Sequence, residues 1–252
     1  MKLGISYLAF HGEELLEYVL RPIRHLLDFV GVVYQDKSFK GNHARPELLQ
    51  TLRRLQELGL VDRLAVYQPD GALSYKENEA AARNLGLDEA IGAGCTHHIT
   101  ADMDEFYLPE QLAFAKSQMG GYDCSMAGMQ VYFKEPTWRL TPTPKQIVPL
   151  IHEVGLRYDV RGKFPVGIDD SRRMTTMRCR RFAPEEVTIH HMSYVRKDMR
   201  EKLENTSHRY DVQKFLAEFD KYCLGDRIQL APDRINRRTV LVENVFHIPS
   251  FT

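Results

Sequence analysis

The sequence predicts an α/β protein with a mixed, mostly parallel central sheet flanked by helices. Strand-like apolar segments and helix-like amphipathic segments alternate through about the first 110 residues. This alternation is typical of parallel strands joined by helical crossovers. The chain has 252 residues, of which 43% are hydrophobic, so it is long enough to bury a substantial core.

The first elements are expected in the order strand, helix, strand, helix, strand. Residues with the period of a strand or of a helix place them at 3–9, 13–27, 29–34, 46–58 and 63–67. Pro22 lies inside the first helical segment and should bend or divide it, because proline lacks the N–H that an interior helical residue donates.

The most informative segment follows these elements. A helix rich in small residues, which includes Arg83, runs through Ala90 and is followed by a glycine turn. An apolar strand over 96–100 then leads into Asp102 and Asp104. Residues two apart on an extended strand point to the same side, so these carboxylates are able to share one divalent cation.

Two acidic residues at this spacing also occur on solvated loops, which is the plain alternative for Asp102 and Asp104. Such loops seldom follow an apolar strand directly. Here the chain returns to apolar residues at once, from Phe106 to Pro109. The context therefore favours a metal site over a solvated loop.

The order of A-R-N-x-G helix, apolar strand and D-x-D resembles the inverting family 2 glycosyltransferases and their relatives with the GT-A fold. The resemblance implies a GT-A-like, Rossmann-like fold. It also implies transfer of a sugar from a UDP-, GDP- or dTDP-sugar to a hydroxyl acceptor, with inversion. Mn²⁺ or Mg²⁺ on Asp102 and Asp104 would neutralise the diphosphate leaving group.

The same resemblance suggests which residues bind the nucleotide. In a largely parallel sheet, ligands lie beyond the carboxyl ends of the strands. Tyr7, Asp36, Arg83 and Asp102 are the candidates for contacts with the donor. For Asp36 a role in stabilising a turn is the alternative, and for Arg83 an exposed position on a surface helix.

An inverting transfer needs a general base that accepts the proton of the acceptor hydroxyl. Asp169 and Asp170 occupy the place in chain order where the resembling family carries its acidic base. The clear E-D helix start and the Q-x-x-R-W motif of processive members are absent here. A plain acidic turn is the alternative for both residues.

A histidine downstream of D-x-D completes the metal site in many enzymes of the GT-A fold, and the segment HMSYVRKD resembles that element. His190 and His191 point to opposite faces of an extended strand, so only one is expected to reach the cation. We favour His191. A histidine with a role only in the core or on the surface is the alternative.

The resemblance implies one GT-A-like domain over residues 1–252. Its first part, about 1–110, would bind the nucleotide sugar, and about 111–252 would bind the acceptor and carry a C-terminal helix. The pattern is helical over 198–223, and the stretch 205–209 is the expected place for a break. Strands are expected around 131–133 and 137–140. The tail 234–252 is either a last strand or a cap over the site.

Composition limits the setting and the partners. The formal net charge is zero, which offers no bulk attraction to nucleic acid or to anionic membranes. Four scattered cysteines favour buried reduced thiols and a cytoplasmic location. No stretch has the roughly 20 apolar residues of a membrane span, so a membrane-bound acceptor would be reached peripherally.

Three other functions are compatible with parts of the sequence. A metal-dependent phosphohydrolase also uses paired aspartates, and a retaining glycosyltransferase can carry the same D-x-D. A module that binds a sugar or nucleotide without turnover is the third. The phosphohydrolase and the binding module leave the A-R-N helix before D-x-D unexplained.

Overall fold

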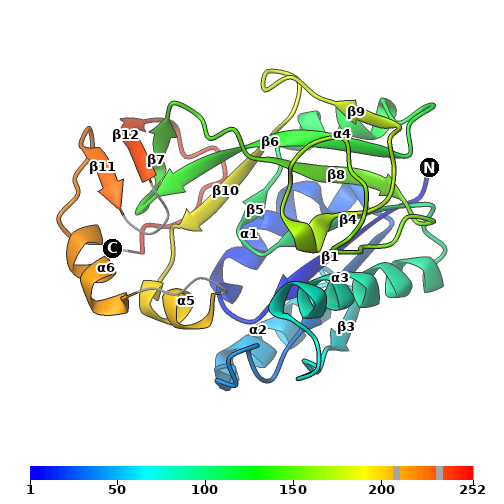
Figure 1. Ribbon diagram of the computed structural model, residues 1–252, viewed down its shortest axis with the longest axis horizontal. Helices are drawn as coiled ribbons and strands as arrows, with labels where there is room; N and C mark the ends of the chain where they lie inside the picture. Colours follow the sequence, from blue (N-terminus) through cyan, green and yellow to red (C-terminus); the bar gives the residue numbers. More distant parts are fainter. Residues whose placement is uncertain (207–210, 231–234, 252) are drawn as a thin grey trace.

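The computed structural model describes residues 1–206, 211–230 and 235–251. Figure 1 shows helices packed around one extended sheet. The first half contains β1 (Leu3–Ala9), α1 (Glu13–Ile23), η1 (Arg24–Leu26), β2 (Phe29–Tyr34), α2 (Pro46–Glu57), β3 (Arg63–Val66), α3 (Tyr75–Gly92), β4 (His97–Asp102) and β5 (Glu105–Phe106).

The second half contributes more strands than helices. It contains α4 (Pro109–Ser117), β6 (Cys124–Phe133), β7 (Glu135–Thr141), β8 (Ile147–Glu153), η2 (Asp170–Arg172), β9 (Cys179–Arg181), β10 (Thr188–Tyr194), α5 (Met199–Asn205), α6 (Val212–Phe219), β11 (Arg227–Leu230) and β12 (Ile235–Leu241).

The strands form one mixed sheet in the order β11-β12-β7-β6-β8-β4-β1-β2-β3. The strands β4, β1, β2 and β3 are parallel to one another. Antiparallel pairs begin where β8 joins β4, and β10 runs parallel to β6. The predicted α/β class, with a mixed sheet flanked by helices, is confirmed, and its purely parallel part is the block from β4 to β3.

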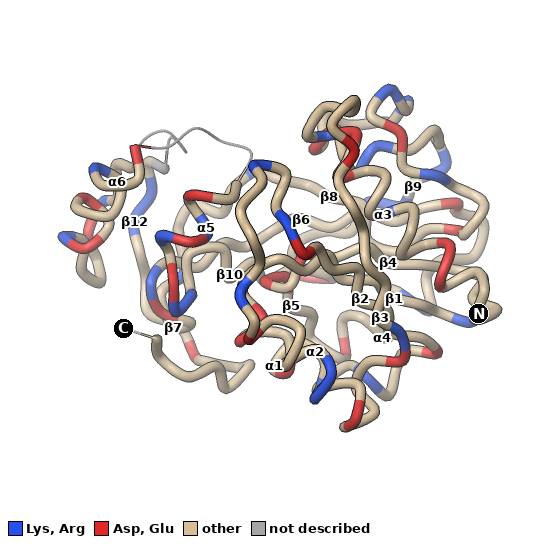
Figure 2. The backbone as a smooth tube through the Cα atoms, turned by 90° about the horizontal axis from the view of Figure 1, so that it is seen from below, with Lys and Arg blue, Asp and Glu red and all other residues tan. Residues whose placement is uncertain are grey.

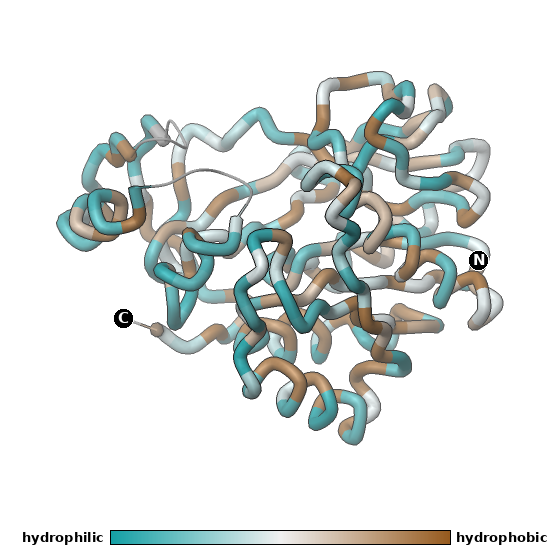
Figure 3. The backbone as a smooth tube through the Cα atoms, turned by 60° about the horizontal axis from the view of Figure 1, so that its bottom comes forward, coloured by the Kyte–Doolittle hydropathy of each residue, from teal (hydrophilic) through white to brown (hydrophobic). Residues whose placement is uncertain are grey.

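Helices cover the two faces of this parallel block. Ile5 and Tyr7 on β1 belong to the main core together with Leu16 of α1. Ser6 points to the other face, where its hydroxyl donates to the carbonyl oxygen of Gly86 on α3 at 2.9 Å. Figure 3 shows hydrophobic and hydrophilic residues mixed around the helical turns, as expected for helices with one buried side.

A close approach between α3 and β1 depends on Gly86. A Cβ added to Gly86 would lie 2.6 Å from the Cβ of Ser6, which real side chains do not tolerate. The absence of a side chain therefore allows the helix to lie directly on the strand. This contact holds α3 beside the end of β4, where Asp102 lies.

Several expected elements differ in extent from those observed. The helix predicted over 13–27 ends at Ile23, directly after Pro22, and continues as the short η1. The helical pattern predicted over 198–223 corresponds to two helices, α5 and α6. The expected break around 205–209 falls partly on 207–210, which lie outside the described residues. For the tail 234–252, the sequence did not decide between a last strand and a cap over the site. The structure has a strand there, β12, which pairs with β7.

The cysteines and the helices bear on the predicted setting. All four cysteines are free; Cys95 and Cys124 are buried, Cys179 is half-buried and Cys223 is exposed. Within 1–206, 211–230 and 235–251, no helix combines the length and the apolar character needed to cross a membrane.

Candidate active site

A cavity of about 590 Å³ opens beyond the carboxyl ends of β1 and β4. The two strands end together because Leu8 is paired with Asp102 in their parallel register. The aspartates of D-x-D line this cavity, together with His11, Asp169, His191 and Lys202. The position is the one expected for a ligand site in a parallel sheet.

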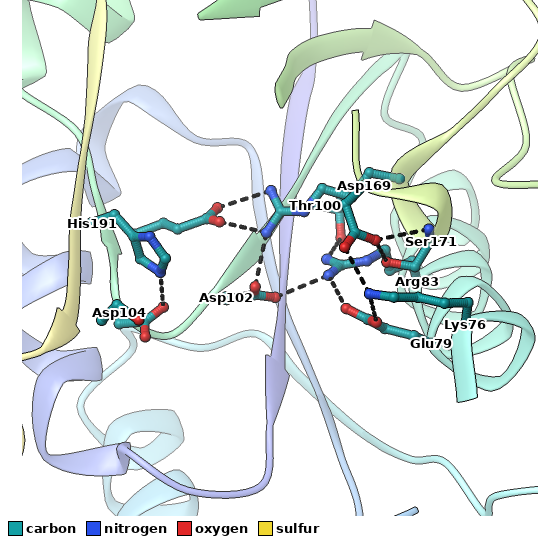
Figure 4. Close-up of polar contacts among 12 residues, drawn as sticks. Lys76, Glu79, Arg83, Thr100, Asp102, Asp104, Asp169, Ser171 and His191 are labelled. Atoms are coloured by element: carbon teal, nitrogen blue, oxygen red, sulfur yellow. Dashed lines mark hydrogen bonds and ion pairs between the residues drawn. The ribbon is translucent and has the colours of Figure 1, made fainter. Parts of the chain in front are cut away.

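Asp102 is held by two arginines (Figure 4). Arg83 Nη2 lies 3.1 Å from one carboxylate oxygen, and Arg172 Nη2 lies 2.9 Å from the other. Arg83 is buried and also donates to Thr100 and Glu79. Burial opposes ionisation of Asp102, but the two arginines outweigh it and lower the pKa of its carboxyl.

Arg172 also forms a buried ion pair with Glu105. The side chains are 4% and 1% exposed, and two guanidinium nitrogens donate to the two oxygens of Glu105. Burial raises the pKa of Glu105, and Arg172 opposes that rise. Arg172 belongs to η2, so this pair ties the loop around η2 to the strand end that carries D-x-D.

Asp104 is almost fully buried and faces cationic side chains. Arg196 Nη2 contacts its Oδ2 directly, and Lys202 Nζ lies 3.3 Å from the same oxygen. The Oδ1 atom lies 3.3 Å from Nε2 of His191. Burial disfavours the charge of Asp104, but Arg196 and Lys202 hold the pKa of its carboxyl well below the usual value. Burial also lowers the pKa of Lys202 to about 8.

Strand pairing brings His191 to this place. β10 lies antiparallel to β5, so His191 is opposite Glu105 in the register. His190 is on the other side, where its Nδ1 lies 2.8 Å from the hydroxyl of Tyr132 and its ring packs on Phe246. The two histidines thus point apart as predicted, and His191 is the one that lines the cavity.

Asp169, which precedes η2, and Asp170, its first residue, also point apart. Asp169 lines the cavity and accepts from Lys76 at 2.6 Å and from the Ser171 hydroxyl at 2.7 Å. Burial opposes its ionisation, but these hydrogen bonds lower the pKa of Asp169 to about 2. Asp170 is 57% exposed and pairs with Arg173, so it does not line the cavity.

Two predicted donor contacts lie away from the cavity lining. Tyr7 is completely buried in the core, where burial raises the pKa of its hydroxyl. Asp36 is exposed and accepts a hydrogen bond from Gln68 at 3.4 Å. A second cavity of about 370 Å³ is lined by Lys37 and Gln68, which neighbour Asp36, and the rings of Phe39 and Tyr75, with centroids 4.5 Å apart, line both cavities.

Arg196 and Lys202 are the main site residues that the sequence did not reveal. Both follow β10 closely, and Lys202 lies on the short helix α5. Lysine and arginine are usually exposed, so their burial is not visible in the sequence. The available signal was their position five and eleven residues after His191.

The cationic side chains bear on whether a divalent ion fits. Mg²⁺ and Mn²⁺ are bound mainly by carboxylate, carbonyl and water oxygens. Among the residues that the structure describes, no three His, Cys, Asp or Glu side chains gather as ligands. Both carboxylates of D-x-D are already contacted by cations. In this arrangement they do not fit Mn²⁺ or Mg²⁺ on Asp102, Asp104 and His191.

Charges elsewhere are distributed without a strong bias. Figure 2 shows acidic and basic residues interspersed along the chain, in keeping with the net charge of zero. The charged residues of the cavity therefore form a local cluster. Local clusters of opposite charge in a cleft are a common feature of functional sites.

Comparisons with known proteins give a weak likeness. No family model matches the sequence, and no curated protein matches it. The crystal structure of S. aureus TarS 1-349 is 12% identical, with a TM-score of 0.43, over 81% of this chain and 63% of that chain. Its complex with UDP-GlcNAc is 12% identical, with a TM-score of 0.42, over 77% and 59%.

Mannose-1-phosphate geranyltransferase from Thermus thermophilus is 17% identical, with a TM-score of 0.33, over 61% of this chain and 50% of that chain. This chain therefore spans less than two thirds of the length of each of these structures. At such TM-scores the likeness carries no argument about chemistry or substrate.

Proposed function

We propose that this protein is a glycosyltransferase of GT-A-like fold that moves a sugar from a nucleotide-diphosphate donor to a hydroxyl acceptor. The observation that carries the proposal is that the D-x-D carboxylates, the buried Arg196 and the half-buried Lys202 face one cavity at the strand ends. This juxtaposition offers charges of both signs, which a sugar diphosphate requires for its hydroxyls and its phosphates.

The donor would lie across the two neighbouring cavities. The edge-to-face pair of Phe39 and Tyr75 offers aromatic surface for a nucleobase. From there the diphosphate would reach the cations around Asp104, and the carboxylate of Asp102 would accept hydrogen bonds from the sugar hydroxyls. Arg83 acts in this proposal by fixing the carboxylate of Asp102, because its buried guanidinium already has three partners.

Asp169 is our candidate for the general base. In the transfer, the acceptor oxygen bonds to the anomeric carbon while the bond from that carbon to the phosphate oxygen breaks. The acceptor proton passes to the base, and the nucleoside diphosphate leaves with the electron pair. Asp169 is ionised at neutral pH, as a base must be, and it lies on the cavity.

We propose that the whole chain acts as one unit. Its first part, through β4, would hold the nucleoside of the donor, and its second part would supply Arg196 and Lys202 beside the diphosphate and receive the acceptor. We propose transfer with inversion, in which the acceptor attacks the anomeric carbon opposite the leaving group and Asp169 accepts its proton.

The test begins with a thermal-shift screen of the purified chain against UDP-, GDP- and dTDP-sugars. A ligand that binds the native state raises its apparent stability, so one nucleotide class is expected to raise the melting temperature. Release of the nucleoside diphosphate from that donor, to water or to a panel of hydroxyl acceptors, then measures transfer.

Asp169→Asn should reduce turnover by about 10²-fold or more while donor binding is kept, since general base catalysis contributes on this scale. Asp170→Asn is the matched control, because this neighbour is exposed and should leave turnover unchanged. Absence of binding to every sugar nucleotide, or cleavage of a phosphomonoester instead, would overturn the proposal.

A further inference from the structure

Two cations share a single carboxylate at one wall of the cavity. Arg196 and Lys202 both contact Oδ2 of Asp104, and the ion pairs of the described residues give neither cation another carboxylate. Their side chains are 5% and 16% exposed. A buried positive charge is costly unless it is paired, so this pair is suited to an anion that enters the cavity.

The surroundings hold both cations in fixed positions. Lys202 Nζ donates to the carbonyl oxygen of Ser193 at 2.6 Å and to its hydroxyl at 2.5 Å. Arg196 Nη1 lies 2.9 Å from Nδ1 of His11, which also lines the cavity. The two side chains are therefore held toward the cavity by neutral partners as well as by Asp104.

Room for Arg196 is provided by a glycine in the loop after β1. Gly12 has a φ of +90°, and a Cβ added there would collide with Nη1 of Arg196. The glycine thus serves both the backbone conformation and the close approach of the guanidinium. The loop after β1 and the segment after β10 together form a cradle for this cation.

We infer that Arg196 and Lys202 bind the donor diphosphate directly and take the role that a divalent cation was expected to fill. This inference rests on the proposed glycosyltransferase function. The diphosphate of a nucleotide sugar carries two negative charges, which a guanidinium and an ammonium group match. As the bond to the anomeric carbon breaks, the leaving diphosphate gains negative charge, and the same two cations stabilise it.

The role of Asp104 then differs from that of a metal ligand. Its carboxylate holds the two cations side by side and offsets part of their mutual repulsion. A divalent ion on Asp104 would have to displace one of them or lie against both. Donor binding is therefore expected to proceed without Mn²⁺ or Mg²⁺.

Calorimetric titration of UDP, GDP and dTDP into the purified chain, in EDTA and separately in Mn²⁺, tests this inference. For the nucleotide that binds, the dissociation constants in the two buffers should agree within about threefold. Lys202→Gln should weaken binding in EDTA by roughly tenfold or more, because a charge-assisted hydrogen bond is lost. Lys202→Arg should restore most of it.

Arg200→Gln is the matched control, since Arg200 is exposed on the same helix and does not line the cavity. Circular dichroism confirms that each variant is folded. Binding that requires Mn²⁺, or equal binding by the Lys202→Gln variant and the parent, would overturn the inference and leave the proposed function in place. Failure of every nucleotide to bind in both buffers would overturn both.

Discussion

Replacing Arg172 by methionine removes the charge from the buried pair with Glu105 and keeps most of the side-chain stem. Both partners are nearly inaccessible, at 4% and 1% exposure, so the carboxylate left behind is not rehydrated. Removing one partner of a buried ion pair costs about 3–5 kcal/mol. At roughly 2 °C per kcal/mol for a chain of this size, the melting temperature should fall by about 6–10 °C.

Arg173→Met provides the matched control. Arg173 is the next residue, but it pairs with Asp170 at the surface, with side-chain exposures of 30% and 57%. Loss of such a pair costs about 0–1 kcal/mol. Urea denaturation of both variants measures the difference in unfolding free energy.

The charge-based reasoning also makes a prediction about rescue. Combining Arg172→Met with Glu105→Gln should recover part of the lost stability, because the unpaired buried charge is removed. Equal stability of the Arg172→Met and Arg173→Met variants would refute the reasoning. So would a double variant whose loss of stability exceeds the sum of the two single-variant losses.

Two further predictions concern stability. Gly86→Ala should lower the unfolding free energy by about 1–3 kcal/mol because of the clash with Ser6. Gly92→Ala, with nothing within 4 Å of the added Cβ, should raise it by up to about 1 kcal/mol. Similar unfolding free energies for both variants would contradict the close contact of α3 with β1. Burial lowers the pKa of His152 from 6.5 to about 4, so the native state binds fewer protons than the unfolded chain, and stability present above pH 6.5 is lost as the pH falls toward 4. His152→Gln should remove about one proton from this pH dependence. The slope of the unfolding free energy against pH, from denaturation curves at several pH values, should then fall by roughly 1.4 kcal/mol per pH unit, and an unchanged slope would contradict the prediction.

In the first half of the fold, β1 and β2 could be predicted from the sequence because they are buried on both faces. Such strands are almost continuously apolar, and the predicted bounds of Leu3–Ala9 and Phe29–Tyr34 agree with β1 and β2. Strand β8 was missed. It contains Pro149, which argues against a central strand, yet this residue lies opposite Met126 beside an irregularity in the register.

Only part of the site could be predicted from the sequence, because the rest depends on contacts between distant segments. The spacing of Asp102 and Asp104 predicted that both lie on the cavity. No sequence pattern separates Asp169, just before η2, from Asp170, its first residue, because the two differ only in the direction they face. The burial of Lys202 depends on the packing of α5 against the strands. Contacts between segments far apart in the chain, unlike local periodicity, leave no trace in a single sequence.

The buried arginine of η2 also sets a rule for engineering the loop between β8 and β9. Exposed positions such as Asp170 are available for exchange, whereas Tyr158 and Met174 are buried and Arg172 connects the loop to Glu105 and Asp102. A transplanted loop that lacks an arginine at this point would leave two acidic groups without their shared partner. Libraries of this loop should therefore vary its exposed positions and keep Arg172 and Asp169 constant.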